Sequence, residues 1–131
     1  MNSLNTLTLN SNKKLKINFD GGDLSSDAGL LLIKEFISKL SIDRLLNLSF
    51  TTKDSALFKY HTDKENLLQM IYMIIAGYFE DNASDKLTNN PIFNAIFDKN
   101  GSASQPTISR FFNRIDNDTL NQFLAIIRKL R

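Results

Sequence analysis

The segment Phe19-Asp-Gly-Gly-Asp-Leu-Ser-Ser-Asp-Ala-Gly-Leu-Leu-Leu-Ile33 separates two kinds of sequence pattern. Before it, residues 6–10 and 15–19 alternate apolar with polar side chains on either side of Ser11-Asn-Lys13, which predicts a half-buried β-hairpin. Because an isolated two-stranded hairpin is only marginally stable, we expect these strands to pack on other elements.

Behind the paired glycines the apolar residues recur at helical spacing. This spacing predicts a helix over about 26–40, with Ser25 or Ser26 as its N-cap. Thr62-Asp-Lys-Glu65 is a capping-box pattern, so a second helix is expected over about 63–80. That helix is apolar on nearly every side, and we expect it to be the most buried element.

Three further helices are predicted in the C-terminal third of the chain. Asn90-Pro91 supplies a cap and a first-turn proline for a short helix that Gly101 should stop. Ser104 opens the next helix, and Asp116 or Asn117 caps the last one. The residues expected to face inward on the former are Ile108, Phe111, Phe112 and Ile115, and the apolar stripe of the latter comprises Leu120, Phe123, Leu124, Ile127 and Leu130.

The bulk composition favours one mainly helical domain. The chain has 131 residues, 42% of them hydrophobic, which is enough to bury a core. We therefore expect a single region over 1–131, with a hairpin and turn over 1–22 and helices, the C-terminal ones helix-turn-helix-like, over 23–131. The absence of cysteine excludes disulfides and thiolate metal sites, and no secretory signal or membrane-spanning run is visible. A cytoplasmic location is expected.

Positive charge is concentrated toward the C-terminal end. The net charge is +2, but residues 99–131 hold six basic and two acidic residues, whereas residues 1–98 hold ten basic and twelve acidic ones. A solvated surface explains such an asymmetry more often than a nucleic-acid partner does, so charge alone decides nothing.

The helix that begins at Ser104 presents small hydrogen-bonding side chains and two arginines on its outward face. Such a face suits DNA phosphates and base edges, and the preceding helix and turn resemble a helix-turn-helix, although the turn is long. An ordinary helical hairpin with a hydrated face fits the pattern equally well. The predicted DNA-facing residues are Gln105, Thr107, Ser109, Arg110, Asn113 and Arg114, with Lys99, Arg128 and Lys129 adding phosphate contacts.

Few side chains could bind a metal or carry catalysis. His61 is the only histidine, and no zinc-binding spacing is present. Asp20, Asp23 and Asp27 lie close in sequence and could form a divalent-metal cluster, but turn formation and helix N-terminal charge explain them more simply. We therefore predict no catalytic residue and no metal site in this chain.

Three motifs, in this order, resemble the N-terminal region of bacterial insertion-sequence DDE transposases of family 1380. They are Phe19 to Ile33, then Ala76-Gly-Tyr78 with Asp85-Lys-Leu87 and Asn90-Pro91, then Ser104 to Asp116. The chain departs from the family pattern at Phe79-Glu80, Thr88 and Asn90. The resemblance implies an RNase H-like protein that moves its own DNA element by metal-dependent strand transfer.

The same resemblance implies that the catalytic carboxylates lie downstream of Arg131. The chain is then expected to be an N-terminal fragment that is not itself an enzyme and holds no cofactor, with magnesium expected for the full-length protein. The first hypothesis is a DNA-binding and assembly region that contacts element ends, without a membrane or small-molecule partner. The alternative is a structural or dimerisation module without direct DNA contact. It is motivated by an aromatic set that one small core would not hide: Phe93, Phe97, Phe111, Phe112 and Phe123.

Overall fold

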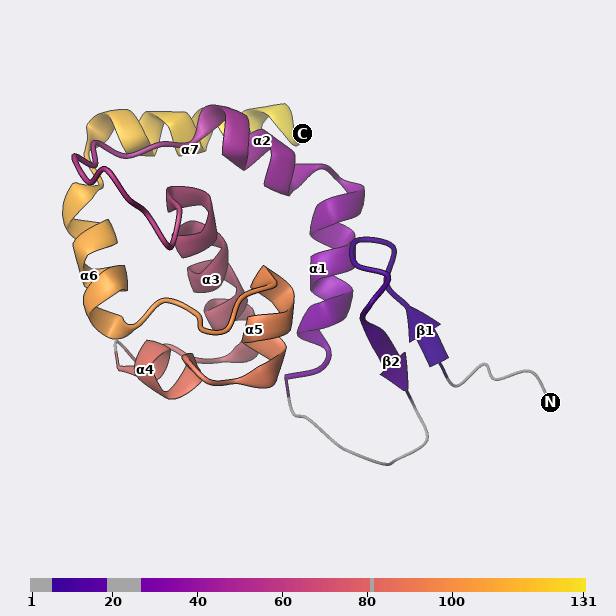
Figure 1. The fold of residues 1–131 in the computed structure, drawn as a ribbon. Coiled ribbons are helices and arrows are strands. Elements are labelled where there is room, and N and C mark those ends of the chain that lie inside the picture. The colour runs from indigo at the N-terminus through magenta and orange to yellow at the C-terminus, as the bar shows by residue number, and fades with distance from the viewer. Residues whose placement is uncertain (1–5, 19–26, 81) are drawn as a thin grey trace.

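The computed structural model describes residues 6–18, 27–80 and 82–131, and within these ranges a two-stranded hairpin precedes seven helices. The elements are β1 (Thr6–Thr8), β2 (Lys16–Asn18), α1 (Leu30–Lys39), α2 (Ile42–Ser49), α3 (Asp63–Ala76), α4 (Ala83–Leu87), α5 (Pro91–Phe97), α6 (Gln105–Arg114) and α7 (Asn117–Lys129). The other helices surround α3, with α1 and α6 on opposite sides of it and α7 across one end (Figure 1). The predicted mainly helical class is confirmed.

The hairpin forms as predicted and docks on α1. β1 and β2 pair antiparallel, with Leu7 opposite Ile17. Leu9, just beyond β1, is fully buried. The backbone N–H groups of Asn10 and Ser11 donate to the Glu35 carboxylate at 3.0 and 2.7 Å, and the Ser11 hydroxyl donates to it as well. Partial burial of Glu35 opposes ionisation, but these donors outweigh it and lower the carboxyl pKa.

The first helix begins later than its apolar spacing predicts, and the short helix α2 that follows it was not predicted. Residues 27–29 form a turn whose carbonyls accept from the N–H groups three residues on, so α1 starts at Leu30 rather than near residue 26. The expected caps Ser25 and Ser26 lie outside the described residues. Ser41, with a left-handed φ of 57°, then redirects the chain into α2.

The capping box of α3 is confirmed, and this helix is the central element with the most buried residues, as predicted, although its C-terminal half is partly exposed. Thr62 and Glu65 exchange hydrogen bonds with each other's backbone, and Gly77 ends the helix at a φ of 86°, before residue 80. Ile74 and Ile75, in the last turn of this helix, are 58% and 51% exposed. The buried side instead includes the polar residue Gln69.

The connection between α5 and α6 is fixed by hydrogen bonds to α3. Asn90 caps α5 as predicted, but Asp98, at a φ of 52°, ends it before Gly101 is reached. The buried amide of Gln69 then donates to the Ala103 carbonyl and accepts from the Ala103 N–H, both at 2.8 Å. α6 follows behind Ser104 as predicted. This clamp sets where α6 begins relative to α3.

One core hides most of the aromatic set that motivated the alternative hypothesis. Phe93 and Phe111 are fully buried, and Phe97 and Phe123 pack against the core. Phe112, expected to face inward, is 51% exposed. On a helix that buries Ile108 and Phe111, Phe112 lies at the edge of the buried face, so the inward expectation is wrong for it.

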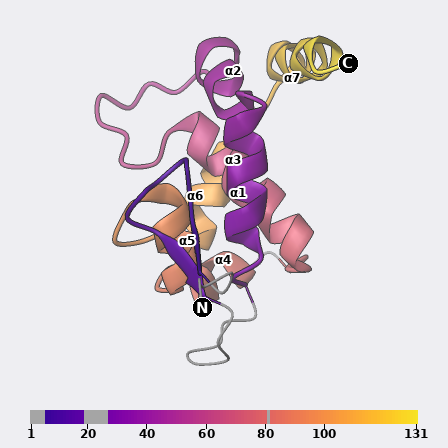
Figure 2. The same ribbon diagram turned by 90° about the vertical axis from the view of Figure 1, so that its right-hand side faces the viewer.

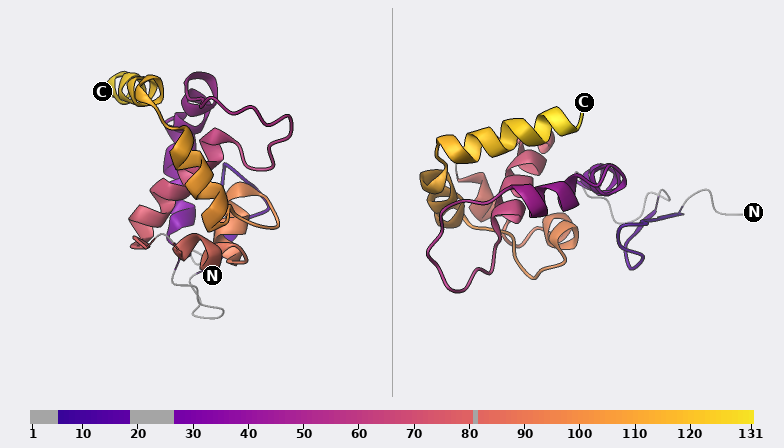
Figure 3. Two further views of the ribbon diagram at one scale, coloured as in Figure 1. Left: turned by 90° about the vertical axis from the view of Figure 1, so that its left-hand side faces the viewer. Right: turned by 90° about the horizontal axis from the view of Figure 1, so that it is seen from above.

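The predicted apolar stripe of α7 is exposed for the most part, although Phe123 packs against the core. Thr119 and Ile126 are the buried residues of α7, which packs mainly on α2. Figures 2 and 3 show α7 at the edge of the molecule, with much of its surface away from the other helices. The residues left on the outside are Leu120 (52% exposed), Leu124 (49%), Ile127 (37%) and Leu130 (45%).

The start of α7 should depend on pH in the acid range. The Asp116 carboxylate accepts from the Thr119 N–H at 3.0 Å and lies 3.1 Å from Lys53 Nζ, and these contacts lower its pKa to about 2. A carboxyl whose native pKa is depressed stabilises the fold above its unfolded pKa, and this contribution is lost as the pH falls through the native value. We expect NMR titration to show the Thr119 amide signal shifting only below about pH 3. A midpoint near 4 would contradict the cap.

Candidate nucleic-acid interface

The α6 helix lies on the outside of the molecule, with one side packed on α3 and α4 (Figures 1 and 3). Ile108 and Phe111 form its buried side. Ser109, Arg110 and Asn113 are exposed on the opposite side. The helix therefore presents a row of hydrogen-bonding side chains from a face held in place by core packing. Helix α5 and the 98–104 connection precede α6 along the chain. The main contact of α5 is nevertheless with α1 rather than with α6.

Arg110 is the exposed cation of this row. Its Nη2 lies 3.3 Å from Thr107 Oγ1, an interaction within the same helix. Gln105 stands at the start of α6, where its backbone N–H donates to the Asp85 carboxylate at 2.8 Å. Five of the predicted residues, Gln105, Thr107, Ser109, Arg110 and Asn113, thus lie together along α6.

Arg114, also predicted to face DNA, is bonded inside the molecule. Its Nε donates to Thr52 Oγ1 at 3.0 Å, and its Nη2 lies 3.3 Å from the buried Asp63 carboxylate and 3.7 Å from Asp54. Asp63 also accepts from the Thr52 N–H and hydroxyl at 2.7 and 2.8 Å. This network joins the end of α6 to the start of α3, so a phosphate contact by Arg114 would have to compete with it.

The three remaining predicted cations lie apart from the α6 row. Lys99 forms an ion pair with Glu65 at 2.6 Å, donates to the Tyr60 carbonyl and lies over the Tyr60 ring. Arg128 and Lys129 are exposed on the last turn of α7, at the opposite end of that helix from α6 (Figure 1). The structure therefore does not bring all nine predicted residues to one surface.

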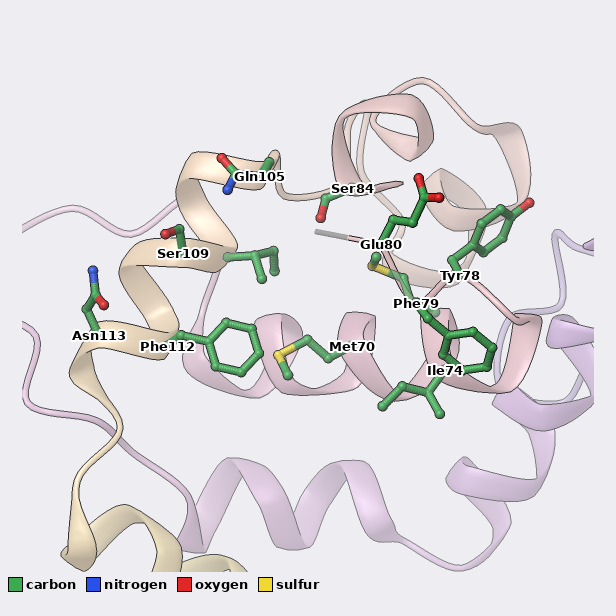
Figure 4. Close-up of a pocket in the computed structure, with 12 residues that line it drawn as sticks. Met70, Ile74, Tyr78, Phe79, Glu80, Ser84, Gln105, Ser109, Phe112 and Asn113 are labelled. Carbon is green, nitrogen blue, oxygen red and sulfur yellow. The ribbon is translucent and has the colours of Figure 1, made fainter. Parts of the chain in front are cut away.

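A groove of about 320 Å³ lies beside the α6 row, between α6 and the C-terminal half of α3. Its apolar lining includes Met70, Ile74 and Phe112, and Phe112 points across toward Met70 (Figure 4). The polar residues Gln105, Ser109 and Asn113 lie on its α6 side, and Glu80 lies across from them. Sequence patterning did not indicate this groove, because it depends on Ile74 and Phe112 being exposed.

Residues of the three sequence motifs meet at the joints between helices. The Tyr78 hydroxyl donates to the buried Asp27 carboxylate at 3.0 Å, and the Asn90 Nδ2 donates to the same carboxylate at 3.0 Å. The Asn90 side-chain oxygen meanwhile caps α5. Asp85 holds the first turn of α6, as described above. These polar residues therefore fix the relative positions of the segment before α1, the end of α3, and helices α4 to α6.

Replacing Tyr78 by phenylalanine should show the strength of the joint at Asp27. The change leaves a buried carboxylate without one of its hydrogen-bond donors, so we expect unfolding free energy to fall by about 1–3 kcal/mol in urea titration. Tyr60→Phe, at an exposed ring, is the matched control and should change stability by less than about 0.5 kcal/mol. Equal stability of the Tyr78 variant and the parent chain would contradict the role of this hydroxyl.

The sequence of this chain matches one known protein family. The family model described as Transposase DDE domain group 1 matches residues 7–131. The chain belongs to the DDE transposases. No curated protein and no solved structure matches it. Membership gives this DDE transposase a role in DNA transposition, with DNA as its partner.

The family match corrects one sequence-based expectation. The chain was expected not to be an enzyme, but the matched model is that of the DDE domain itself, so this DDE transposase belongs to a family of enzymes. Within residues 6–18, 27–80 and 82–131, no three His, Asp or Glu side chains are grouped so that they could hold a metal ion. The carboxylates among these described residues therefore form no ligand set for a divalent cation. Asp20 and Asp23, of the acidic cluster considered above, lie outside the described residues.

One structural finding bears on the membrane. In the part of the chain that the structure describes, no helix has the length and apolar character needed to cross a bilayer.

Proposed function

We propose that the outer face of α6 is the surface by which this transposase contacts DNA at the ends of its element. The observation that carries the proposal is the row of Ser109, Arg110 and Asn113, exposed on a helix whose opposite side is buried. Hydroxyl and amide groups hydrogen-bond to phosphates and base edges, and an exposed guanidinium can bind guanine or phosphate. Gln105 and Thr107 extend the row toward the N-terminus of the helix.

A rigid support favours this face over a mobile basic segment. Phe111 and Ile108 anchor the buried side of α6, the Gln69 clamp holds the connection before it, and the Arg114 network holds its end. Preorganised side chains lose less conformational entropy on binding. In this proposal Arg114 mainly positions α6, and Lys99, Arg128 and Lys129 contribute to the positive field around the DNA rather than to the α6 surface.

The order of the three motifs supports a more specific assignment, to insertion-sequence family 1380 of bacteria. The contacts of Asp27, Tyr78, Asn90 and Asp85 place residues of these motifs at the joints between the elements of the fold.

Binding should be tested with fluorescein-labelled duplexes taken from the genomic DNA on either side of the gene, compared with shuffled duplexes. We expect the anisotropy of the flanking duplexes to rise at lower protein concentration than that of the shuffled ones. The affinity should fall as salt is raised, since phosphate contacts release counterions. Absence of binding at low salt would refute the proposed DNA surface.

A second candidate function is assembly with another copy of the chain. The exposed apolar residues of α7 favour it, because single exposed leucines are ordinary whereas a row of them along one helix marks an interaction surface. The two functions are compatible, since α6 and α7 are separate helices.

A further inference from the structure

The exposed apolar row of α7, hereafter the α7 stripe, consists of Leu120, Leu124, Ile127 and Leu130. The spacings of four, three and three residues place these side chains along one side of a helix. Leu120, Leu124 and Ile127 lie beside, rather than within, the side that buries Thr119 and Ile126, whereas Leu130, four residues after Ile126, continues that side at the C-cap of the helix. The stripe is therefore available in addition to the contact that α7 already makes with α2.

The two ends of α7 carry opposite charge. Asp116 caps the helix and Asp118 lies in its first turn, while Arg128, Lys129 and Arg131 lie at its other end. Lys53 Nζ lies 3.1 and 3.4 Å from the two aspartates and offsets part of their charge, which leaves about one net negative charge against three positive ones. An antiparallel partner helix with the same charge distribution would be attracted at both ends.

We infer that the α7 stripe is a self-association surface, where α7 of a second copy of this chain packs antiparallel across a twofold axis near Leu124. The inference rests on the proposed assembly function and names its surface and partner. In this arrangement residues 116–118 of one copy lie opposite residues 128–131 of the other, and the helix dipoles also oppose each other favourably. A parallel pair would instead place three cations beside three cations.

In a twofold-symmetric dimer both copies contribute the same surface, so the α7 stripe must be complementary to itself. Leu120 of each copy lies opposite Ile127 of the other, and Leu124 meets its own counterpart. α7 has 13 residues and is about 20 Å long. A pair of such helices buries less than the roughly 1,200–2,000 Å² of stable complexes, so the dimer should be weak, with a dissociation constant above about 1 µM.

Sedimentation velocity over a concentration series of the 131-residue chain provides the first test. We expect concentration-dependent dimers, which Leu120→Gln combined with Leu124→Gln weakens at least tenfold, since glutamine keeps helix propensity but removes apolar area. Leu57→Gln combined with Phe58→Gln is the matched control. These two loop residues are 102% and 97% exposed, more than any residue of the stripe, so general hydrophobic adhesion would respond to them first.

Engineered cysteines test the orientation, because the chain has no cysteine of its own. Asn117→Cys and Arg128→Cys place single thiols at exposed positions near the two ends of α7. After mild oxidation of a mixture, we expect the disulfide that joins Asn117→Cys to Arg128→Cys to predominate over either symmetric one. Predominant self-linking of Arg128→Cys would refute the antiparallel arrangement even if the glutamine variant failed to fold.

A strictly monomeric parent chain at all concentrations would overturn the inference, as would dimers that the loop control weakens and the stripe variant does not. Titration of the Leu120→Gln, Leu124→Gln variant with flanking duplexes tests the DNA proposal separately. Retained binding by a monomeric variant supports the stripe as an assembly surface and leaves the α6 proposal intact. Loss of self-association together with normal circular dichroism is the expected result.

Discussion

Replacing Phe111 by alanine should lower the free energy of unfolding by about 3–5 kcal/mol, the range for large aromatic truncations in a core. Phe111 is fully buried on the inner side of α6, and its ring centroid lies 6.3 Å from that of Phe50. The Arg114 guanidinium carbon lies 5.9 Å from the centroid of the same ring. Truncation removes the contacts of this ring both to Phe50, at the end of α2, and to Arg114 of the polar network. One local shift therefore cannot close the cavity.

The neighbouring residue provides a matched control. Phe112 has the same side chain on the same helix but is 51% exposed, so Phe112→Ala should cost less than about 1 kcal/mol. Urea denaturation of both variants, followed by circular dichroism, measures the difference. Equal losses would show that α6 is rotated about its axis relative to this structure, and the proposed DNA face would then be wrong as well.

Local sequence signals predicted the starts of α3, α5, α6 and α7 because those signals act through neighbouring backbone atoms. Thr62 and Glu65 form the capping box that their spacing predicts, and Asn90 caps α5 just before Pro91. The hairpin alternation was equally local. Each of these signals needs only residues a few positions apart, so the sequence alone contains the information.

The faces of the helices could not be predicted in the same way. Ile74, Phe112 and the α7 stripe are apolar, and apolar spacing predicts burial without specifying how far neighbouring helices extend over each surface. Helix α2 was missed because its start depends on Ser41 adopting a positive φ, a conformation that serine rarely favours.

The candidate site was predicted only where its residues follow one another along a helix. Gln105 to Asn113 share α6, so helical periodicity placed them together. Arg114 was assigned to the same face, yet it bonds with Thr52 and Asp63, which lie 62 and 51 residues earlier in the chain. Lys99 likewise pairs with Glu65 across 34 residues. Such long-range partners have no signature in sequence spacing.

Replacing Arg110 by alanine should weaken DNA binding about 5- to 150-fold, which corresponds to about 1–3 kcal/mol. Arg110 is the exposed cation on the α6 row, and its intramolecular contact is a 3.3 Å interaction with Thr107 in the same helix, which costs little to break. If its guanidinium contacts a phosphate, the slope of the logarithm of affinity against the logarithm of salt concentration should fall by about 1. If it reads guanine, discrimination between flanking and shuffled duplexes should fall instead.

Two other arginines separate this effect from loss of charge and loss of fold. Arg44 is exposed on α2, away from α6, so Arg44→Ala removes the same charge and should leave affinity within about twofold of the parent chain. Arg114→Ala leaves the buried Asp63 carboxylate without its ion-pair partner and should lower the stability of the fold. Thermal unfolding without DNA would detect this loss. Binding that falls equally in the Arg44 and Arg110 variants would mean that only net charge attracts DNA. The α6 face would then make no specific contact with DNA, because a specific contact by Arg110 requires that its loss weaken binding more than the loss of an arginine on a different surface.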